Sequence, residues 1–207
     1  MSILKLKESP SKCTGPAVRD KLPCEDSLAA GIGAVFYARG DHKTKEVQYL
    51  SASWDYSYRD VEEIARASDR IALVSVGNVE NTFIDQSVPY TIFSVKVETP
   101  VYNCEEDQEF SIYMTGAETD TKIMEIAGDP LLQPGDEILV FCKENPDGTY
   151  RILGGPQGRL VYDDGTLNSI SVVLAQEGEE GMLSGLIVEN ADARALIREI
   201  QGYVGAS

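Results

Sequence analysis

Residues 70–80 read RIALVSVGNVE, and this run decides the fold class. Its apolar side chains occupy both alternating faces between Ile71 and Val76. A strand with one face in water alternates apolar and polar residues, whereas a strand covered on both faces is apolar on both. The run therefore predicts a central β-strand that is buried on both sides.

The residues after this run continue the β pattern. PYTIFSVKVE at 89–98 and EFSIYMT at 109–115 alternate apolar and polar residues, as strands with one buried face do. Further strand-like runs are TKIMEIA (121–127), EILVFCK (137–143), TYRIL (149–153) and RLVY (159–162). The side chains expected to face the core in the two alternating runs are Phe93, Val95, Val97, Phe110, Ile112 and Met114.

Turn-forming residues separate these runs. Pro134-Gly135 has the order of a type II turn, which needs a positive φ at its second central residue. Asp147-Gly148 and Asp164-Gly165 supply the left-handed positions of two further tight turns. Short strands at near-regular spacing predict a barrel or a sandwich rather than an α/β fold.

Two helices are expected beside the strands. In SYRDVEEIARASD (57–69), Asp60 is placed to cap a short helix, with Glu63 in the capping-box position. In NADARALIREIQGYVG (190–205), Asn190 is the expected cap of an amphipathic helix. The apolar face of that second helix is formed by Ala193, Leu196, Ile197 and Ile200.

These patterns divide the chain into four parts. Residues 1–27 are expected to be an irregular arm, and 28–58 a hairpin or extended segment built from the apolar runs Ala34–Ala38 and Val47–Leu50. The strands of the main domain occupy residues 59–170. A linker and the C-terminal helix occupy residues 171–207.

The charge is strongly negative and unevenly distributed. The net charge is −16, and residues 1–24 carry +3, so the remaining chain carries −19. Nucleic-acid binding needs clustered lysine and arginine, so this balance argues against it. No apolar stretch is long enough to span a bilayer, and no secretory signal is visible, which predicts a cytoplasmic protein. The alternative is the cell envelope or the extracellular space, if an export signal is missing.

The cysteines and the histidine form no recognisable catalytic or metal motif. Cys13, Cys24, Cys104 and Cys142 are too widely spaced for a zinc site, and their pairing stays open. Cys142 is expected to be a buried strand residue, while Cys13 and Cys24 either pair in an oxidising compartment or remain free thiols. His42, the single histidine, lies in a polar link and is expected at the surface.

The glycine-rich run GGPQG at 154–158 has two interpretations. A phosphate-binding loop needs a helix after its glycines and free backbone N–H groups, but here strand-like runs flank the glycines and Pro156 removes one N–H. The run is therefore interpreted as a sharp turn or bulge.

Acidic clusters are interpreted as solvated loops, because their spacing does not match a calcium loop. The clusters are Glu105-Glu106-Asp107, Asp163-Asp164 and Glu177 with Glu179-Glu180. The sequence thus predicts no catalytic residue, no cofactor and no metal site.

The aromatic residues of SASWDYSYRD offer the one candidate surface. Trp54, Tyr56 and Tyr58 recur at every second position, which places them on one side of a strand. Such a row either packs under the helix that follows or binds a sugar, protein or peptide ligand.

The order of these segments resembles a bacterial domain family of uncharacterised function, whose members are commonly exported or lipid-anchored. The resemblance covers about residues 52–170 and, more loosely, the terminal helix; its most particular pieces are GDPLL-x-PGDE at 128–137 and GGPQGR at 154–159. It implies an OB-like small β-barrel of five to seven strands, similar in outline to the netrin-like fold of metalloproteinase inhibitors. The inhibitors' Cys-x-Cys motif has no match at Cys13 or Cys24, so no inhibitory residue carries over.

The leading functional hypothesis is a non-enzymatic module that binds protein or peptide. The alternatives are a metal-dependent or carboxylate-driven hydrolase and a module like a protease inhibitor. The oligomeric state is left open.

Overall fold

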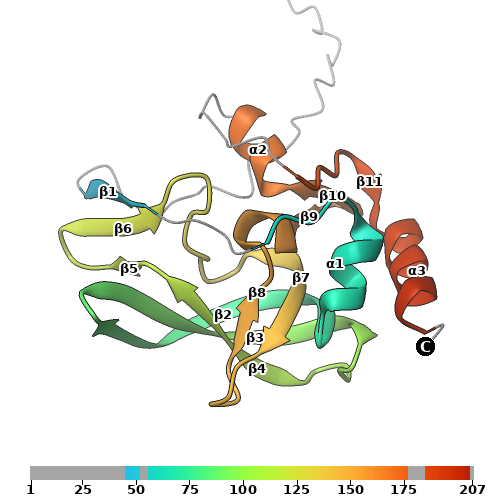
Figure 1. The fold of residues 1–207 in the computed structure, drawn as a ribbon, viewed down its shortest axis with the longest axis horizontal. Helices are drawn as coiled ribbons and strands as arrows, with labels where there is room; N and C mark the ends of the chain where they lie inside the picture. The colour runs from blue at the N-terminus through green and yellow to red at the C-terminus, as the bar shows by residue number, and fades with distance from the viewer. Residues whose placement is uncertain (1–44, 52–55, 177–184, 206–207) are drawn as a thin grey trace, which may run out of the picture. The chain divides into compact units, whose positions relative to one another are not determined.

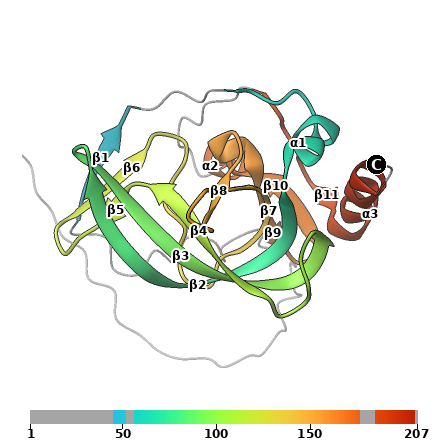
Figure 2. The same ribbon diagram turned by 60° about the horizontal axis from the view of Figure 1, so that its bottom comes forward.

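The computed structural model describes residues 45–51, 56–176 and 185–205. Two long antiparallel strands lie side by side within the larger sheet (Figures 1 and 2). Strand β2 (Arg70–Asp85) pairs with β3 (Val88–Tyr102) through a turn at Gln86-Ser87. Ile71 and Leu73 of β2 belong to one buried cluster, and Ala72 and Val74 belong to another. The prediction of a central strand buried on both faces is therefore confirmed.

Within the described residues, eight strands form one mainly antiparallel sheet in the order β11-β10-β9-β7-β2-β3-β4-β8. The strands besides β2 and β3 are β4 (Glu109–Thr115), β7 (Glu137–Glu144), β8 (Tyr150–Ile152), β9 (Arg159–Asp163), β10 (Thr166–Ser169) and β11 (Ala191–Asp192). Strand β8 pairs in parallel with β4 and antiparallel with β7. The pairings β2–β3, β3–β4, β4–β8, β8–β7 and β7–β2 thus form a closed circuit.

The predicted core positions and turns agree with this sheet. Phe93, Val95, Val97, Phe110, Ile112 and Met114 are all buried in the cluster that also holds Ala72 and Val74. Gly135 has φ +95°, and the Asp136 N–H donates to the Gln133 carbonyl at 3.0 Å, as the predicted turn requires.

A smaller sheet contains part of the described segment before residue 59. Strand β1 (Glu46–Leu50) runs parallel to β6 (Lys122–Ile126), and β5 (Ala117–Glu118) pairs with the other edge of β6. The run 47–50 is therefore a strand, but its described partner comes from 122–126. The other predicted hairpin arm, Ala34–Ala38, lies outside the described residues.

Helix α1 (Val61–Ala67) begins at Asp60 as predicted, since the Asp60 carboxylate accepts the Glu63 N–H at 2.8 Å. The capping box differs in one contact, because the Glu63 carboxylate accepts the N–H of Arg59 at 2.9 Å. Helix α1 lies beside α3 (Ala193–Val204), whose predicted apolar face is buried (Figure 1).

The start of α3 corrects the sequence prediction. Asp192 caps the helix by accepting the Ala195 N–H at 2.8 Å, whereas Asn190 has φ +49° and donates its N–H to the Asn168 side chain. The physical reason is that residues 191 and 192 first pair with β10, so the helix begins after the strand.

A helix also occupies the start of the predicted linker. Helix α2 (Ile170–Gln176) follows β10 directly and buries Ile170 and Leu174 against Val161 of β9. Its β-branched run ISVVLAQ has weak helix propensity, so packing against the sheet overrides the local preference. Among the described residues, no helix combines the length and the apolar character needed to cross a membrane.

Candidate functional site

The tyrosine segment, residues 56–58, leads into α1 and contains two of the three aromatic residues singled out in the sequence. The segment is irregular and not a strand, so the predicted strand geometry is wrong here. The Tyr56 and Tyr58 rings nevertheless meet, with centroids 4.9 Å apart. Tyr58 is only 6% exposed and belongs to the core, whereas Tyr56 is 54% exposed. Trp54 lies outside the described residues.

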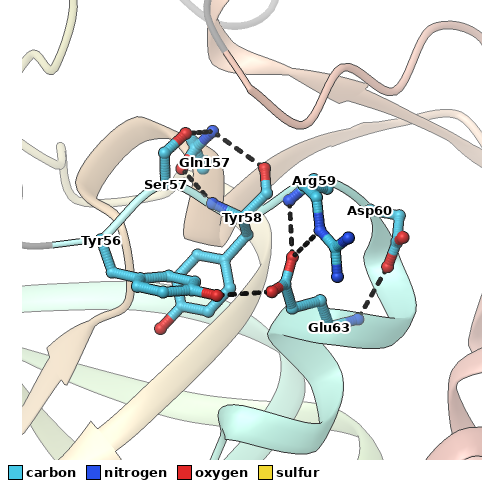
Figure 3. A network of polar contacts seen from close by, with 7 residues as sticks. All are labelled: Tyr56, Ser57, Tyr58, Arg59, Asp60, Glu63 and Gln157. Carbon is cyan, nitrogen blue, oxygen red and sulfur yellow. Dashed lines mark hydrogen bonds and ion pairs between the residues drawn. The ribbon is translucent and has the colours of Figure 1, made fainter.

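Gln157 holds the tyrosine segment in place (Figure 3). Its Oε1 accepts the Tyr58 N–H at 3.1 Å, and its Nε2 donates to the Tyr58 carbonyl at 3.4 Å and to Ser57 Oγ at 3.3 Å. The buried side-chain amide therefore pairs with the backbone of Tyr58 as a neighbouring strand would. Sequence reasoning did not find this contact, because the partners are 99 residues apart.

The glycines of GGPQG allow this close contact. The run forms a single 3₁₀ turn over Gly155–Gly158 between β8 and β9, so the turn interpretation is confirmed. Gly154 has φ +61°, and a Cβ there would lie 3.0 Å from Gln157 Oε1 and 3.1 Å from Tyr58 Cδ2. A side chain at Gly154 would therefore press on both residues that fix the tyrosine segment.

Glu63 positions the exposed ring of Tyr56 (Figure 3). The Tyr56 hydroxyl donates to Glu63 Oε1 at 2.6 Å, and the Arg59 side chain donates to Glu63 Oε2 at 3.1 Å. These hydrogen bonds, with the one from Tyr56 the largest cause, lower the pKa of the Glu63 carboxyl to about 2. The Tyr56 hydroxyl thus points toward α1, while the Tyr58 hydroxyl in Figure 3 points away from Glu63.

A buried ion pair joins two segments singled out in the sequence, 128–137 and 154–159. Arg159 Nη2 donates to Asp129 Oδ1 at 2.6 Å and to the Pro130 carbonyl at 2.7 Å. The Arg159 and Asp129 side chains are 3% and 6% exposed. Burial raises the pKa of the Asp129 carboxyl, and the Arg159 charge opposes that rise. The pair therefore ties GDPLL to GGPQGR inside the protein.

A half-open pocket of about 330 Å³ lies where these parts meet. We call it the tyrosine pocket and define it by Tyr56, Tyr58, Tyr113, Asn145, Arg151 and Gly154. Asp129 and the apolar side chains of Met114 and Leu153 also line the pocket. The pocket combines aromatic rings, an apolar floor and a few polar groups, which is the usual composition of a ligand site.

Further aromatic rings lie beyond the pocket on the neighbouring strands β2 and β3. Tyr113 stacks on Tyr90 at 4.8 Å, and Phe83 lies 5.6 Å from Tyr90. Phe83 and Tyr113 border a shallow groove with Asn145, Pro146 and Asp147. These rings come from three strands, so no local sequence pattern could have grouped them.

The acidic clusters contribute no metal site within the described residues. No group of three or more His, Cys, Asp or Glu side chains there is placed to hold a metal ion. Asp107 of the first cluster forms a salt bridge of 2.6 Å with Lys96. His42 and the acidic residues 177, 179 and 180 lie outside the described residues.

The described cysteines are free thiols. Cys142 is fully buried, as predicted, and burial raises its pKa. The Cys104 thiol donates to the Ile71 carbonyl at 3.3 Å. Cys13 and Cys24 lie outside the described residues, so both alternatives, a disulfide and free thiols, stay open.

No family model, curated protein or solved structure matches the chain.

Proposed function

We propose that this protein is a non-enzymatic binding module and that the tyrosine pocket holds a segment of a protein or peptide. The observation that carries this proposal is that Tyr56, Tyr58 and Tyr113 line one pocket, and that Tyr113 lies beside Phe83 in the neighbouring groove. Rigid, amphipathic tyrosine rings supply large contact area at a low cost in conformational entropy. A row of such rings suits an extended ligand better than a compact one.

We also propose that the closed circuit of β2, β3, β4, β8 and β7 is an OB-like barrel. The parallel pairing of β4 with β8 and the antiparallel return to β2 through β7 support this proposal. In OB folds the ligand lies over the second and third strands. The corresponding strands here are β3 and β4, which carry Tyr90 and Tyr113; this support is an analogy of fold alone.

The proposal is tested with a mixed library of synthetic hexapeptides, half with free carboxyl termini and half amidated. We expect some members to bind the full chain and expect Tyr56→Ala to weaken their binding at least tenfold. Tyr49→Ala is the matched control, since Tyr49 is 60% exposed on β1 and does not line the pocket. If no peptide binds, or if both variants lose binding equally, the proposed function is wrong.

A carboxylate-driven hydrolase is the second candidate, and one observation favours it. Asp129 lies on the pocket wall, and burial raises the pKa of its carboxyl, as in many general acids. Its salt bridge with Arg159 is equally suited to a structural role. Turnover by the wild-type protein on a panel of ester, peptide and glycoside substrates, abolished by Asp129→Asn in a folded variant, would establish the hydrolase and refute the binding module.

A further inference from the structure

We infer that the tyrosine pocket captures the carboxyl terminus of its peptide partner, with Arg151 and the Tyr58 hydroxyl binding the terminal carboxylate. This inference rests on the proposed function, because it specifies which part of a peptide enters the pocket. Three features of the described part of the pocket carry it: an arginine without a carboxylate partner, a tyrosine hydroxyl without an acceptor, and an apolar wall beside both.

Arg151 stands out in an acidic chain. Acidic residues outnumber basic ones by 34 to 18, and the neighbouring Lys143 forms a salt bridge of 2.6 Å with Asp69. Arg151 lines the pocket, yet among the described residues no carboxylate pairs with it. Its Nη1 donates to Asn145 Oδ1 at 3.0 Å, which orients the guanidinium. A guanidinium held in this way is suited to bind a carboxylate through its other N–H groups.

The Tyr58 hydroxyl supplies a second donor. Tyr58 as a residue is only 6% exposed, and its hydroxyl has no hydrogen-bond partner among the described residues. The hydroxyl oxygen itself is not fully enclosed, so it is open to a ligand in the pocket that Tyr58 lines. Burial raises the pKa of this hydroxyl, and the charges of Arg151 and Lys143 oppose the rise, so both cations act on it. A carboxylate bound to Arg151 would provide the missing acceptor.

The rest of the pocket favours a terminal residue. Arg159 pairs with Asp129, so the negative charge of Asp129 on the pocket wall is compensated and does not repel a carboxylate bound to Arg151. In a C-terminal residue the carboxylate and the side chain are attached to the same Cα. One pocket that has apolar walls at Met114 and Leu153 can therefore bind both groups. An internal acidic side chain would bring a carboxylate without an apolar group and would continue the chain in both directions.

The groove beyond Tyr113 favours neutral or basic residues before the terminus. Asp147 borders this groove, and the negative charges of Asp85 and Asp147 act on the Tyr113 hydroxyl. Tyr113 is half-buried, and its ring borders the groove together with Asp147. The ligand is therefore expected to have a basic or neutral body and a single carboxylate at its end.

The test compares matched peptides on the full chain by isothermal titration calorimetry. The probes are acetyl-Lys-Ala-Lys-Ala-X with X = Leu, Phe, Val or Tyr, each as free acid and as amide. A third form, amidated, carries Glu before X. We expect the free acids to bind at least tenfold more tightly than their amides, because a hydrogen bond to a charged group is lost on amidation.

Variants then assign the carboxylate to the two donors. Arg151→Gln and Tyr58→Phe are each expected to reduce the preference for acid over amide at least fivefold. Arg194→Gln, an exposed arginine of α3 outside the pocket, should leave the preference unchanged. The melting temperature of each variant shows whether it is folded.

The outcomes separate the inference from the proposed function. Equal binding of acid and amide, or equal binding of the Glu-containing amide and the free acid, would refute terminal capture while peptide binding stands. Failure of these peptides and of the whole hexapeptide library to bind would refute both. An acid preference that persists in folded Arg151→Gln would refute the assigned anchor.

Discussion

At the scale of single residues, Gln157 fixes the position of the candidate site. Its amide satisfies both backbone groups of Tyr58 in a buried setting, and an unsatisfied buried polar group costs about 1–3 kcal/mol. The Gln157 side chain therefore shapes the pocket by holding the tyrosine segment, and it does not itself line the pocket.

We expect Gln157→Ala to lower the free energy of unfolding by about 1–3 kcal/mol, because the Tyr58 N–H and carbonyl lose their partner. Urea unfolding followed by fluorescence measures the change. Gln201→Ala, at an exposed position of α3, is the control and should change stability little. Equal stability of Gln157→Ala and the wild type would contradict the proposed anchoring.

Glu63 gives a prediction about pH. The folded-state pKa of its carboxyl is about 2, below the ordinary value of 4.5. Its contribution to stability is therefore present above pH 4.5 and is lost as the pH falls toward 2. NMR titration of the carboxyl carbon should give a midpoint near pH 2. Tyr56→Phe should move that midpoint toward 4.5, because it removes the largest cause of the shift; an unchanged midpoint would exclude the Tyr56 contact.

At the scale of elements, the 3₁₀ turn between β8 and β9 serves two purposes. It reverses the chain between two strands. It also places Gln157 beside the tyrosine segment and the next residue but one, Arg159, beside the GDPLL segment. Gly154 has a left-handed backbone and lies close to the Tyr58 ring, and glycine suits both conditions because it has no Cβ.

Two glycine variants separate backbone strain from this close approach. Gly154 and Gly148 both have positive φ, so alanine at either costs about 1–2 kcal/mol. A Cβ at Gly148 meets open space, whereas a Cβ at Gly154 presses on Tyr58 and Gln157. We expect Gly154→Ala to be clearly less stable than Gly148→Ala in thermal unfolding. Equal melting temperatures would show that the approach to Tyr58 is not tight.

At the scale of the whole molecule, the Asp129–Arg159 pair links the segment after β6 to β9. The two partners are 30 residues apart and almost fully buried. Removing one member of a buried pair leaves the other charge without compensation, which costs about 3–5 kcal/mol.

Asp129→Asn should therefore destabilise the protein by about 3–5 kcal/mol, since it leaves the Arg159 guanidinium buried and unpaired. Guanidinium chloride unfolding measures the loss. Asp163→Asn, at the end of β9, should cost far less because that side chain has no ion pair within the described residues. A loss below about 1 kcal/mol, the size expected of a surface pair, would show that the buried pair contributes little.

Much of the fold was predictable because it depends on local order along the chain. Residues 70–76 are apolar on both faces of the strand, so both faces must be covered. The runs at 89–98 and 109–115 alternate apolar and polar residues, and this alternation shows which face of each strand is buried. Asp60 caps a helix and Pro134-Gly135 forms a turn through hydrogen bonds that span only three residues, and both predictions are confirmed. The start of α3 and the whole of α2 were missed, because strand pairing and packing override local propensity there.

By itself, the sequence determined the mainly β class, the buried strand positions and the tight turns, and it singled out Tyr56 and Tyr58 as candidates. The tertiary structure alone decided the site, because its groups come from distant segments. Gln157 reaches Tyr58 across 99 residues, and Tyr113 and Arg151 come to the pocket from separate strands. Hydrogen-bond satisfaction and burial act between groups that are close in space, and no pattern along the chain records that closeness.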